Sequence, residues 1–292
     1  DLEDLEKEIA ELDEILKSKA RIKTIIVKEL KSIAEKYGQP RKSIIIYDDV
    51  ARYEEETVEI PDYPVNLFFT KEGYFKKITP QSLRMSGEQK LKDGDEIIQE
   101  LEFTNNCDLL FFTDKCQVYK AKADDFAQTK ASVLGDYVAA KLGFDEGENA
   151  VKMVVTKDYK GMLLFAFENG KAAKVPLESY ATKTNRKKLT GAYSDKSPLV
   201  GLLYMPEDEE VLFKASSGNM LLVHTGALAL KTTRSTQGVA VLKPKKGHRL
   251  FSIERYKDGT FTNPKRYRTG SLPARGALPV NDDSKDEQLS LI

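Results

Sequence analysis

Lysine and arginine residues follow a strand–turn–strand pattern that recurs along this 292-residue sequence. Cations spread along a curved surface could neutralise nucleic-acid phosphates and release their counterions. A single basic cluster is typical of a solvated turn, but recurrence at the same place in successive repeats favours phosphate contact. The candidate residues are Lys76, Lys77, Arg84, Lys120, Lys122, Lys171, Lys174, Lys183, Arg186, Lys187, Lys188, Lys231, Arg234, Lys243, Lys245, Lys246 and Arg249.

The sequence lacks the common motifs of catalytic and metal-binding sites. It has no Gly-x-x-x-x-Gly-Lys-Ser/Thr loop, no His-Glu-x-x-His and no Gly-x-Ser-x-Gly elbow. His224 and His248 have no cysteine nearby in sequence, and the acidic runs at 54–56 and 207–210 are typical of solvated turns. Cys107 and Cys116 are interpreted as reduced structural thiols. We therefore expect no catalytic residue, no metal and no cofactor.

Charge is distributed unevenly, although 46 basic residues balance 46 acidic ones. Residues 44–125 hold 10 basic and 18 acidic residues, whereas residues 126–200 hold 12 and 8, and residues 201–280 hold 13 and 6. Residues 281–292 hold one basic and four acidic residues. The basic second half could face a polyanionic partner, although charge alone favours a solvated surface.

Targeting signals and membrane spans are not recognisable. No run of eighteen apolar residues and no charged-then-apolar leader occurs, so we expect a cytosolic protein without a membrane partner. The first residue, Asp1, falls within a helical pattern, which predicts that a longer natural chain precedes it.

The first 42 residues are predicted to form a long helix. Apolar residues recur at spacings of three and four, with a break in phase at residues 18–22. Gly38, as a left-handed cap, and Pro40 should end the helix. A continuous helix would be ~55 Å long at 1.5 Å per residue. It could lie on the following domain or form half of an antiparallel coiled coil. The stripe consists of Leu2, Leu5, Ile9, Leu12, Leu16, Ile26, Leu30, Ile33 and Tyr37.

From Ser43 onward the pattern alternates with a period of two and predicts β-strands. One hairpin recurs at 65–78, 108–121, 162–175 and 210–223. The third turn position, where glycine alone has no steric cost at positive φ, is Gly73, Cys116, Gly170 and Gly218. Each hairpin is followed by a further predicted strand, at 96–103, 137–142, 198–205 and 238–242.

The spacings of 43, 54 and 48 residues between these turn positions are typical of a propeller-like array. We expect about five four-stranded blades over residues 43–280, with a β-sandwich as the alternative. Residues 249–268 could form a degenerate fifth unit, or pair with residues 43–49 to close the ring. Residues 281–292 are predicted to be a disordered acidic tail.

Three segments resemble the C-terminal region of bacterial type IIA topoisomerase A subunits. EKYGQPRKSIII at 35–46 is similar to the end of their coiled coil, and TKEGYFKKITPQSL at 70–83 and FFTDKCQVYKA at 111–121 are similar to their first two blades. The resemblance implies a β-pinwheel, whose blades exchange strands and whose basic rim bends DNA. The cleavage tyrosine and magnesium-binding carboxylates of that family lie in other domains.

The resemblance also implies partners. They are double-stranded DNA, the remainder of the A subunit with its dimer mate, and the ATPase B subunit, in the bacterial nucleoid. This fragment alone would not be an enzyme, but part of an ATP-dependent topoisomerase that needs no cofactor in this region.

The sequence of the loop at 84–94 helps to distinguish a gyrase-like from a topoisomerase IV-like chain. Gyrases carry a Gln-Arg-Arg-Gly-Gly-Lys-Gly box there, whereas this chain has RMSGEQKLKDG. The chain is thus more similar to topoisomerase IV, although a gyrase-like paralogue with a degenerate box is the other interpretation. A propeller that scaffolds protein partners is the alternative function, and a propeller hydrolase with carboxylates in a central channel is a third.

Overall fold

The computed structural model describes residues 1–39, 59–182, 187–280 and 283. It divides into two compact units, residues 1–58 and residues 59–292. The predicted strand at 43–49 lies outside the described residues, so its proposed role in closing the ring stays a prediction. Among the described residues, no helix is both long and apolar enough to cross a membrane.

The first unit contains two helices rather than the single one expected. Helix α1 is Leu2–Lys17 and α2 is Lys19–Tyr37. Ser18 separates them in an extended conformation, and its hydroxyl accepts a hydrogen bond from the Arg21 amide at 3.4 Å, as a helix N-cap does. The expected break in phase therefore corresponds to a real interruption.

Helix α2 ends at Tyr37, before Gly38, as predicted, but Gly38 has φ −62° and is not a left-handed cap. The apolar stripe of both helices is exposed, with no buried residue in either one. A coiled-coil partner for this stripe stays a prediction.

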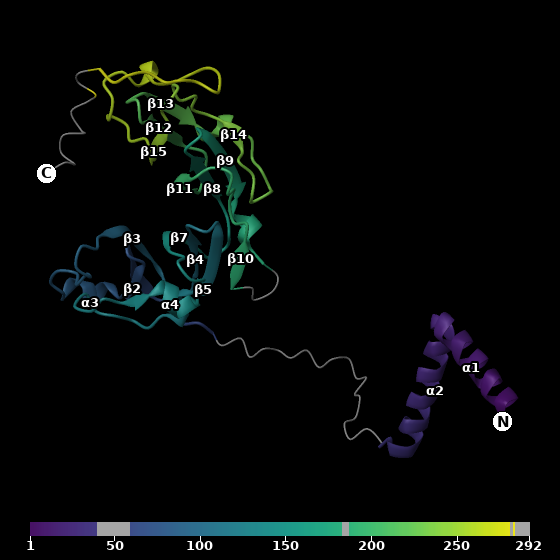
Figure 1. The fold of residues 1–292 in the computed structure, drawn as a ribbon. Coiled ribbons are helices and arrows are strands. Elements are labelled where there is room, and N and C mark those ends of the chain that lie inside the picture. The colour runs from purple at the N-terminus through teal and green to yellow at the C-terminus, as the bar shows by residue number, and fades with distance from the viewer. Residues whose placement is uncertain (40–58, 183–186, 281–282, 284–292) are drawn as a thin grey trace. The chain divides into compact units, whose positions relative to one another are not determined.

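The second unit is mainly β, with four antiparallel sheets in a propeller-like ring (Figure 1). We call the sheets blades 1 to 4. Their strands, in hydrogen-bonded order, are β3-β1-β2-β6, β10-β5-β4-β7, β11-β8-β9-β14 and β13-β12-β15. The strand bounds are β1 Pro64–Thr70, β2 Tyr74–Ile78, β3 Ile97–Thr104, β4 Asp108–Thr113, β5 Gln117–Lys122, β6 Asp136–Tyr137, β7 Ala150–Thr156, β8 Met162–Phe167, β9 Lys171–Pro176, β10 Lys188–Thr190, β11 Leu199–Met205, β12 Glu210–Ala215, β13 Met220–His224, β14 Val239–Ala240 and β15 Leu250–Arg255.

Short helices connect these strands. Two are α-helical, α3 at Pro80–Arg84 and α4 at Val138–Leu142. Four are 3₁₀ helices: η1 Ala123–Asp125, η2 Leu177–Tyr180, η3 Thr225–Ala227 and η4 Pro264–Arg266. Each of the first three follows directly after the second strand of a hairpin.

Neighbouring blades exchange strands, as the resemblance implies. Strand β6 follows the blade-2 hairpin in sequence but pairs with β2 of blade 1. In the same way β10 returns to blade 2 and β14 returns to blade 3. After β15, the chain returns to β13, where Met220 pairs with Ala277 and Leu222 with Arg268. Blades 1 to 3 are therefore each completed by a strand that follows the hairpin of the next blade, and blade 4 by the chain after its own β15, so adjacent blades are tied together.

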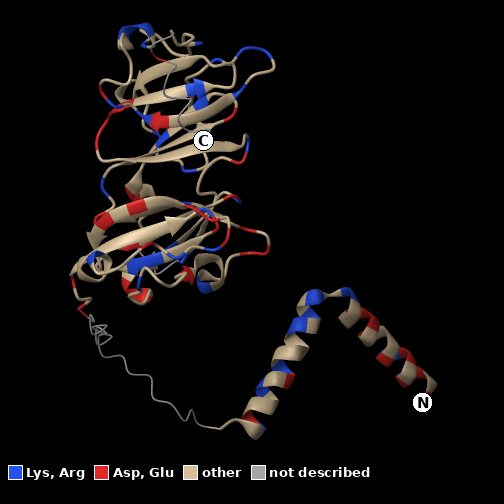
Figure 2. Cartoon of the chain, turned by 90° about the vertical axis from the view of Figure 1, so that its left-hand side faces the viewer, with Lys and Arg blue, Asp and Glu red and all other residues tan. Residues whose placement is uncertain are grey.

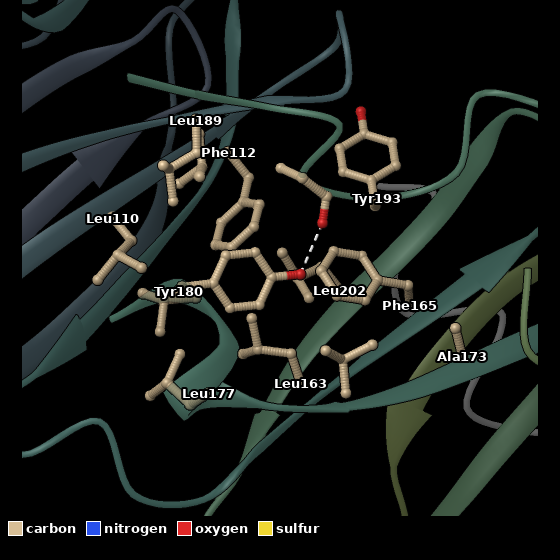
Figure 3. Packing of buried hydrophobic residues seen from close by; sticks show 14 of the residues in the cluster. Leu110, Phe112, Leu163, Phe165, Ala173, Leu177, Tyr180, Leu189, Tyr193 and Leu202 are labelled. Carbon is tan, nitrogen blue, oxygen red and sulfur yellow. Dashed lines mark hydrogen bonds between the residues drawn. The ribbon is translucent and has the colours of Figure 1, made fainter. Parts of the chain in front are cut away.

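The hydrophobic core is divided among the junctions between blades. Blades 2 and 3 bury their facing side chains together with Tyr180 from η2 and Leu189 from β10 (Figure 3). The Tyr180 hydroxyl donates a 2.6 Å hydrogen bond to the Ala192 carbonyl, which satisfies the buried phenol. Similar clusters lie between blades 1 and 2 and between blades 3 and 4. Phe261 and Tyr267 cover the remaining face of blade 4.

The described residues contain four blades, and the expectation of about five is not confirmed. Residues 250–255, expected in a fifth unit, form β15 of blade 4. Residues 137–142, expected as a strand, are mostly helix α4, and the further strand of blade 2 is instead β7. The short β14 likewise belongs to blade 3 rather than to the hairpin before it.

The repeated turn has the conformation that its sequence predicts. Gly73, Gly170 and Gly218 have φ between +79° and +86°, and Cys116 occupies the equivalent position at φ +55°. Both cysteines are free thiols. The alignment of the second repeat with the other three is therefore correct.

Candidate nucleic-acid interface

Three of the candidate lysines occupy one repeated position, four residues after the third turn residue. They are Lys77, Lys120 and Lys174, and the fourth repeat has Leu222 there. Lys77 and Lys174 are only 2% and 5% exposed, and Lys120 is half-buried. Because the second strand of each hairpin lies at a junction, these side chains point into the structure rather than toward solvent.

Each ammonium group bonds to the 3₁₀ helix of the following blade. Lys77 Nζ donates to the Ala123 carbonyl at 2.8 Å, and Lys120 Nζ donates to the Tyr180 carbonyl at 3.0 Å. Lys174 Nζ donates to the Thr225 carbonyl at 2.9 Å. We call these three side chains the junction lysines. They link blade 1 to 2, blade 2 to 3 and blade 3 to 4.

A second acceptor completes each link. Asn105 Oδ1 lies 2.6 Å from Lys77 Nζ, Thr182 Oγ1 lies 3.1 Å from Lys120 Nζ, and Asp208 Oδ1 lies 2.9 Å from Lys174 Nζ. Burial lowers the pKa of Lys77 and Lys120. Hydrogen bonds to carbonyl oxygens offset part of the cost of removing a cation from water.

Lys76 is also enclosed, at 1% exposure. Its ammonium donates to the side chain of Gln89 and to the carbonyls of Lys90 and Ala131, at 3.0, 2.6 and 3.2 Å. Burial lowers its pKa. Lys76, Lys77 and Lys174 were expected to face DNA phosphates. In the structure they are instead buried, and their ammonium groups bond to acceptors inside the fold.

Other candidates reach the surface but have partners. Lys122 lies 3.5 Å from Asp108, and Lys188 lies 2.6 Å from Asp145. Lys171 donates to the Gln237 side chain at 3.2 Å, and Arg234 donates to the Ser179 carbonyl at 3.0 Å. Lys231 is half-exposed, Lys187 is exposed, and Lys183 and Arg186 lie outside the described residues.

Four exposed cations lie close together in sequence just before β15 of blade 4. Lys243, Lys245, Lys246 and Arg249 occupy the exposed loop between β14 and β15. Counting partners in the described part of the chain, Arg249 alone in this group forms an ion pair, with Glu168 at 3.6 Å. Sequence reasoning also missed exposed cations in the segment that covers blade 4; apart from Arg268, which is paired with Glu210 at 2.6 Å, they are Lys265, Arg266 and Arg275. We call these seven residues the blade-4 basic surface.

Backbone contacts connect the parts of this surface. The Lys243 amide donates to the Ala274 carbonyl at 2.8 Å, which places Arg275 next to the β14–β15 loop. Arg266 Nε donates to the Leu278 carbonyl at 3.3 Å, which joins η4 to the same segment. In Figure 2 Lys and Arg segments lie on several loops of the upper sheets, while segments of both charges mark strands and loops of the lower ones. Lys265, Arg266 and Arg275 do not belong to a hairpin motif, so only their positive charge could have marked them as candidates in the sequence.

The loop at 84–94 has mixed charge, and hydrogen bonds and an ion pair attach it to neighbouring residues. Arg84 is exposed, and its Nε donates to the Pro80 carbonyl at 3.4 Å. The Lys90 amide donates to Ala131 at 2.8 Å, close to the buried Lys76 ammonium, and Lys92 forms a 3.5 Å ion pair with Glu72. Within the described ranges, no group of three His, Cys, Asp or Glu residues is placed to bind a metal ion.

Comparison with known proteins identifies the relatives of this chain. No family model matches it. It is 27% identical over 276 residues to the DNA gyrase A subunit of Streptomyces coelicolor, covering 89% of this chain and 32% of that protein. It is 25% identical over 304 residues to the DNA gyrase A subunit of Metamycoplasma arthritidis, covering 97% and 34%. Its homologues are DNA gyrase A subunits. The chain spans about a third of the length of these relatives.

Solved structures of such proteins share the fold. The C-terminal domain of a DNA topoisomerase IV aligns with a TM-score of 0.59 at 24% identity, covering 68% of this chain and 62% of that one. The C-terminal domain of a DNA gyrase A aligns with a TM-score of 0.50 at 18% identity, covering 74% and 76%. The resemblance inferred from the blade motifs to gyrase and topoisomerase IV is thereby confirmed.

Proposed function

We propose that the β unit binds and bends duplex DNA through the blade-4 basic surface. The observation that supports this most directly is a group of seven exposed cations, among which only Arg249 forms an ion pair within the described residues. Unpaired exposed cations are available to phosphates, and each contact releases counterions. Homology to DNA gyrase A subunits supports DNA as the polyanionic ligand in this proposal.

In the intact protein this unit would guide DNA segments for strand passage. We propose that its partners are the remainder of the A subunit with its dimer mate and the ATPase B subunit, as in a type IIA topoisomerase. The fragment itself would be non-catalytic, so purified chain should not relax supercoiled plasmid with or without ATP. Relaxation by the chain alone would contradict this part of the proposal.

The 84–94 loop favours the topoisomerase IV-like form of this role. Its basic residues are interspersed with Glu88, Asp93 and Asp95, and Lys92 is already paired with Glu72. A loop of mixed charge adds little to DNA wrapping because its acidic groups repel phosphates. We therefore propose that the domain steers DNA without wrapping it fully.

A titration with a 40-base-pair duplex tests the DNA proposal. Replacing Lys243, Lys245 and Lys246 by Glu should weaken binding at least tenfold, because three phosphate contacts are replaced by repulsion. Lys115, Lys130 and Lys160 provide a matched control, since they are also exposed and change the net charge equally. Equal losses in both variants would refute a local interface.

One observation favours a protein-binding scaffold as the second candidate. Blades 1 to 4 each have a β-bulge, in β3, β7, β11 and β15 respectively. The bulged residue is apolar in every case: Ile98, Val151, Val200 and Phe251. Phe251 is 66% exposed. Bulges re-aim side chains, so these four could contact a partner. If the variant with Lys243, Lys245 and Lys246 replaced by Glu binds DNA as tightly as wild type, the protein-binding scaffold becomes the preferred function.

A further inference from the structure

A hollow of about 350 Å³ is lined by strands from all four blades. Its walls include β3 of blade 1, β7 of blade 2, β11 of blade 3 and the last residue of β15 in blade 4. Two cations, Lys152 and Arg255, contribute to this lining. Neither belongs to the blade-4 basic surface, and the proposed DNA interface does not use either of them.

Lys152 faces blade 3 from blade 2. It lies opposite Phe112 in the β4–β7 ladder, and Phe112 belongs to the core between blades 2 and 3. The Lys152 side chain is half-buried and also lines a neighbouring hollow formed by residues 198–203 of blade 3. Among the described residues it has neither a hydrogen-bond nor an ion-pair partner, unlike the junction lysines, each of which has two acceptors.

Arg255 faces blade 3 from the opposite side. It lies opposite Val211 in the β12–β15 ladder, and Val211 belongs to the core between blades 3 and 4. Its guanidinium is held by the Glu209 carboxylate, at 2.8 and 3.1 Å, and by the Tyr204 carbonyl. Lys152 and Arg255 thus approach the same strand, β11, from its two neighbouring blades.

The electrostatic balance around Lys152 is unfavourable to its charge. Burial, and secondarily the positive charge of Arg255, lower the Lys152 pKa. Glu100 and Glu102 line the hollow too, but they lie opposite Phe68 and Asn66. Phe68 packs with Ile78 on the face of blade 1 that is turned away from blade 2. These carboxylates therefore do not pair with Lys152.

Asp114 lines the neighbouring hollow, but it is engaged elsewhere. It accepts hydrogen bonds from the Asn149 amide and side chain, at 3.0 and 3.1 Å. A half-buried ammonium without a protein acceptor can be satisfied by an ion or by water. A small oxyanion would supply the missing acceptor and screen Lys152 from Arg255.

We propose that this hollow binds a small free oxyanion of the phosphate class, with Lys152 as its principal ligand and Arg255 as a supporting cation. The proposal does not depend on DNA binding by blade 4. Its location between blades 2, 3 and 4 means that an anion bound there would also stabilise their arrangement around β11.

Thermal unfolding of the full chain in inorganic phosphate, against chloride at equal ionic strength and pH, tests this site. At ten times the dissociation constant, phosphate should raise the Tm by roughly 3 to 5 °C. Lys152→Met should abolish this rise while leaving the Tm in chloride equal to or above that of wild type, because a partnerless cation has been removed. Lys160→Met, which changes an exposed lysine, should retain the rise.

Phosphorus NMR of inorganic phosphate supplies a second readout should Lys152→Met fail to fold. Wild type and Lys152→Arg should broaden the phosphate line, because both keep a cation at this position. Saturating duplex DNA should leave the broadening in place, since a free anion is the ligand. Equal Tm values for wild type in phosphate and chloride, a full phosphate effect in Lys152→Met, or loss of the NMR signal on adding DNA would each overturn the proposal.

Discussion

The junctions between blades and the blade-4 basic surface use the same side chain in opposite ways. Lys174 is 5% exposed and its ammonium is held by Asp208 and the Thr225 carbonyl, whereas Lys245 is exposed on a loop. Both lie in the basic half of the sequence. A cation with fixed acceptors stabilises a junction, while only a cation facing solvent can exchange water for phosphate. Burial therefore decides which lysines could contact DNA.

The largest expected difference between the two regions is in stability. Lys174→Met leaves the Asp208 carboxylate and the Thr225 carbonyl without their ammonium partner, so we expect a loss of about 3 kcal/mol in the free energy of unfolding. The Tm should fall by roughly 6 to 12 °C. Lys245→Met should change stability by less than ~0.5 kcal/mol. Equal stability of the two variants would show that the junction lysines do not hold blades together.

Glycine substitutions extend the comparison to the backbone. Gly170 and Gly247 both have positive φ, but an added Cβ at Gly170 would lie 2.0 Å from the Leu242 carbonyl oxygen, whereas nothing lies within 4 Å at Gly247. Gly170→Ala should cost about 3 kcal/mol, from strain and displacement of β14. Gly247→Ala should cost about 1 kcal/mol. Chemical denaturation would measure both, and similar losses would contradict close packing at the blade-3 turn.

Cys116→Gly should have the smallest effect and the opposite sign. Cys116 has φ +55°, where a side chain costs about 1 kcal/mol, but its sulfur packs against the core between blades 2 and 3. We expect a net gain of about 0.5 kcal/mol, measured by denaturation. A variant less stable than wild type would show that the sulfur's packing outweighs its backbone strain.

The repeat was predictable from sequence because its signals are local. Alternating apolar residues and a positive-φ turn fix each hairpin, so the four repeats, including Cys116, correspond to four blades. The strands that complete the blades were less predictable, because exchange makes β6, β10 and β14 pair with the preceding blade. Residues 137–142 are apolar enough for a strand, yet mostly form helix α4.

The candidate site was predicted only in part, for a physical reason. Lys77 and Lys174 follow turns, and sequence position alone suggested exposure, but both strand faces are buried between blades. The loop at 243–249 was recognised from its density of basic residues, and the structure places those side chains in solvent. Arg275 joins them only through the pairing of Lys243 with Ala274, a contact between segments that no local pattern reveals.

The salt dependence of DNA binding tests most directly whether exposed, rather than buried, lysines form the interface. We would measure duplex affinity from low to physiological salt for wild type and for a variant with Lys243, Lys245 and Lys246 replaced by Gln. If each lysine contacts one phosphate, the slope of log affinity against log salt should become shallower by about 0.9 per lysine, or ~2.7 in all. Gln replacement of Lys115, Lys130 and Lys160 should leave it unchanged. An unchanged slope in the blade-4 variant would contradict the assignment of DNA binding to that surface.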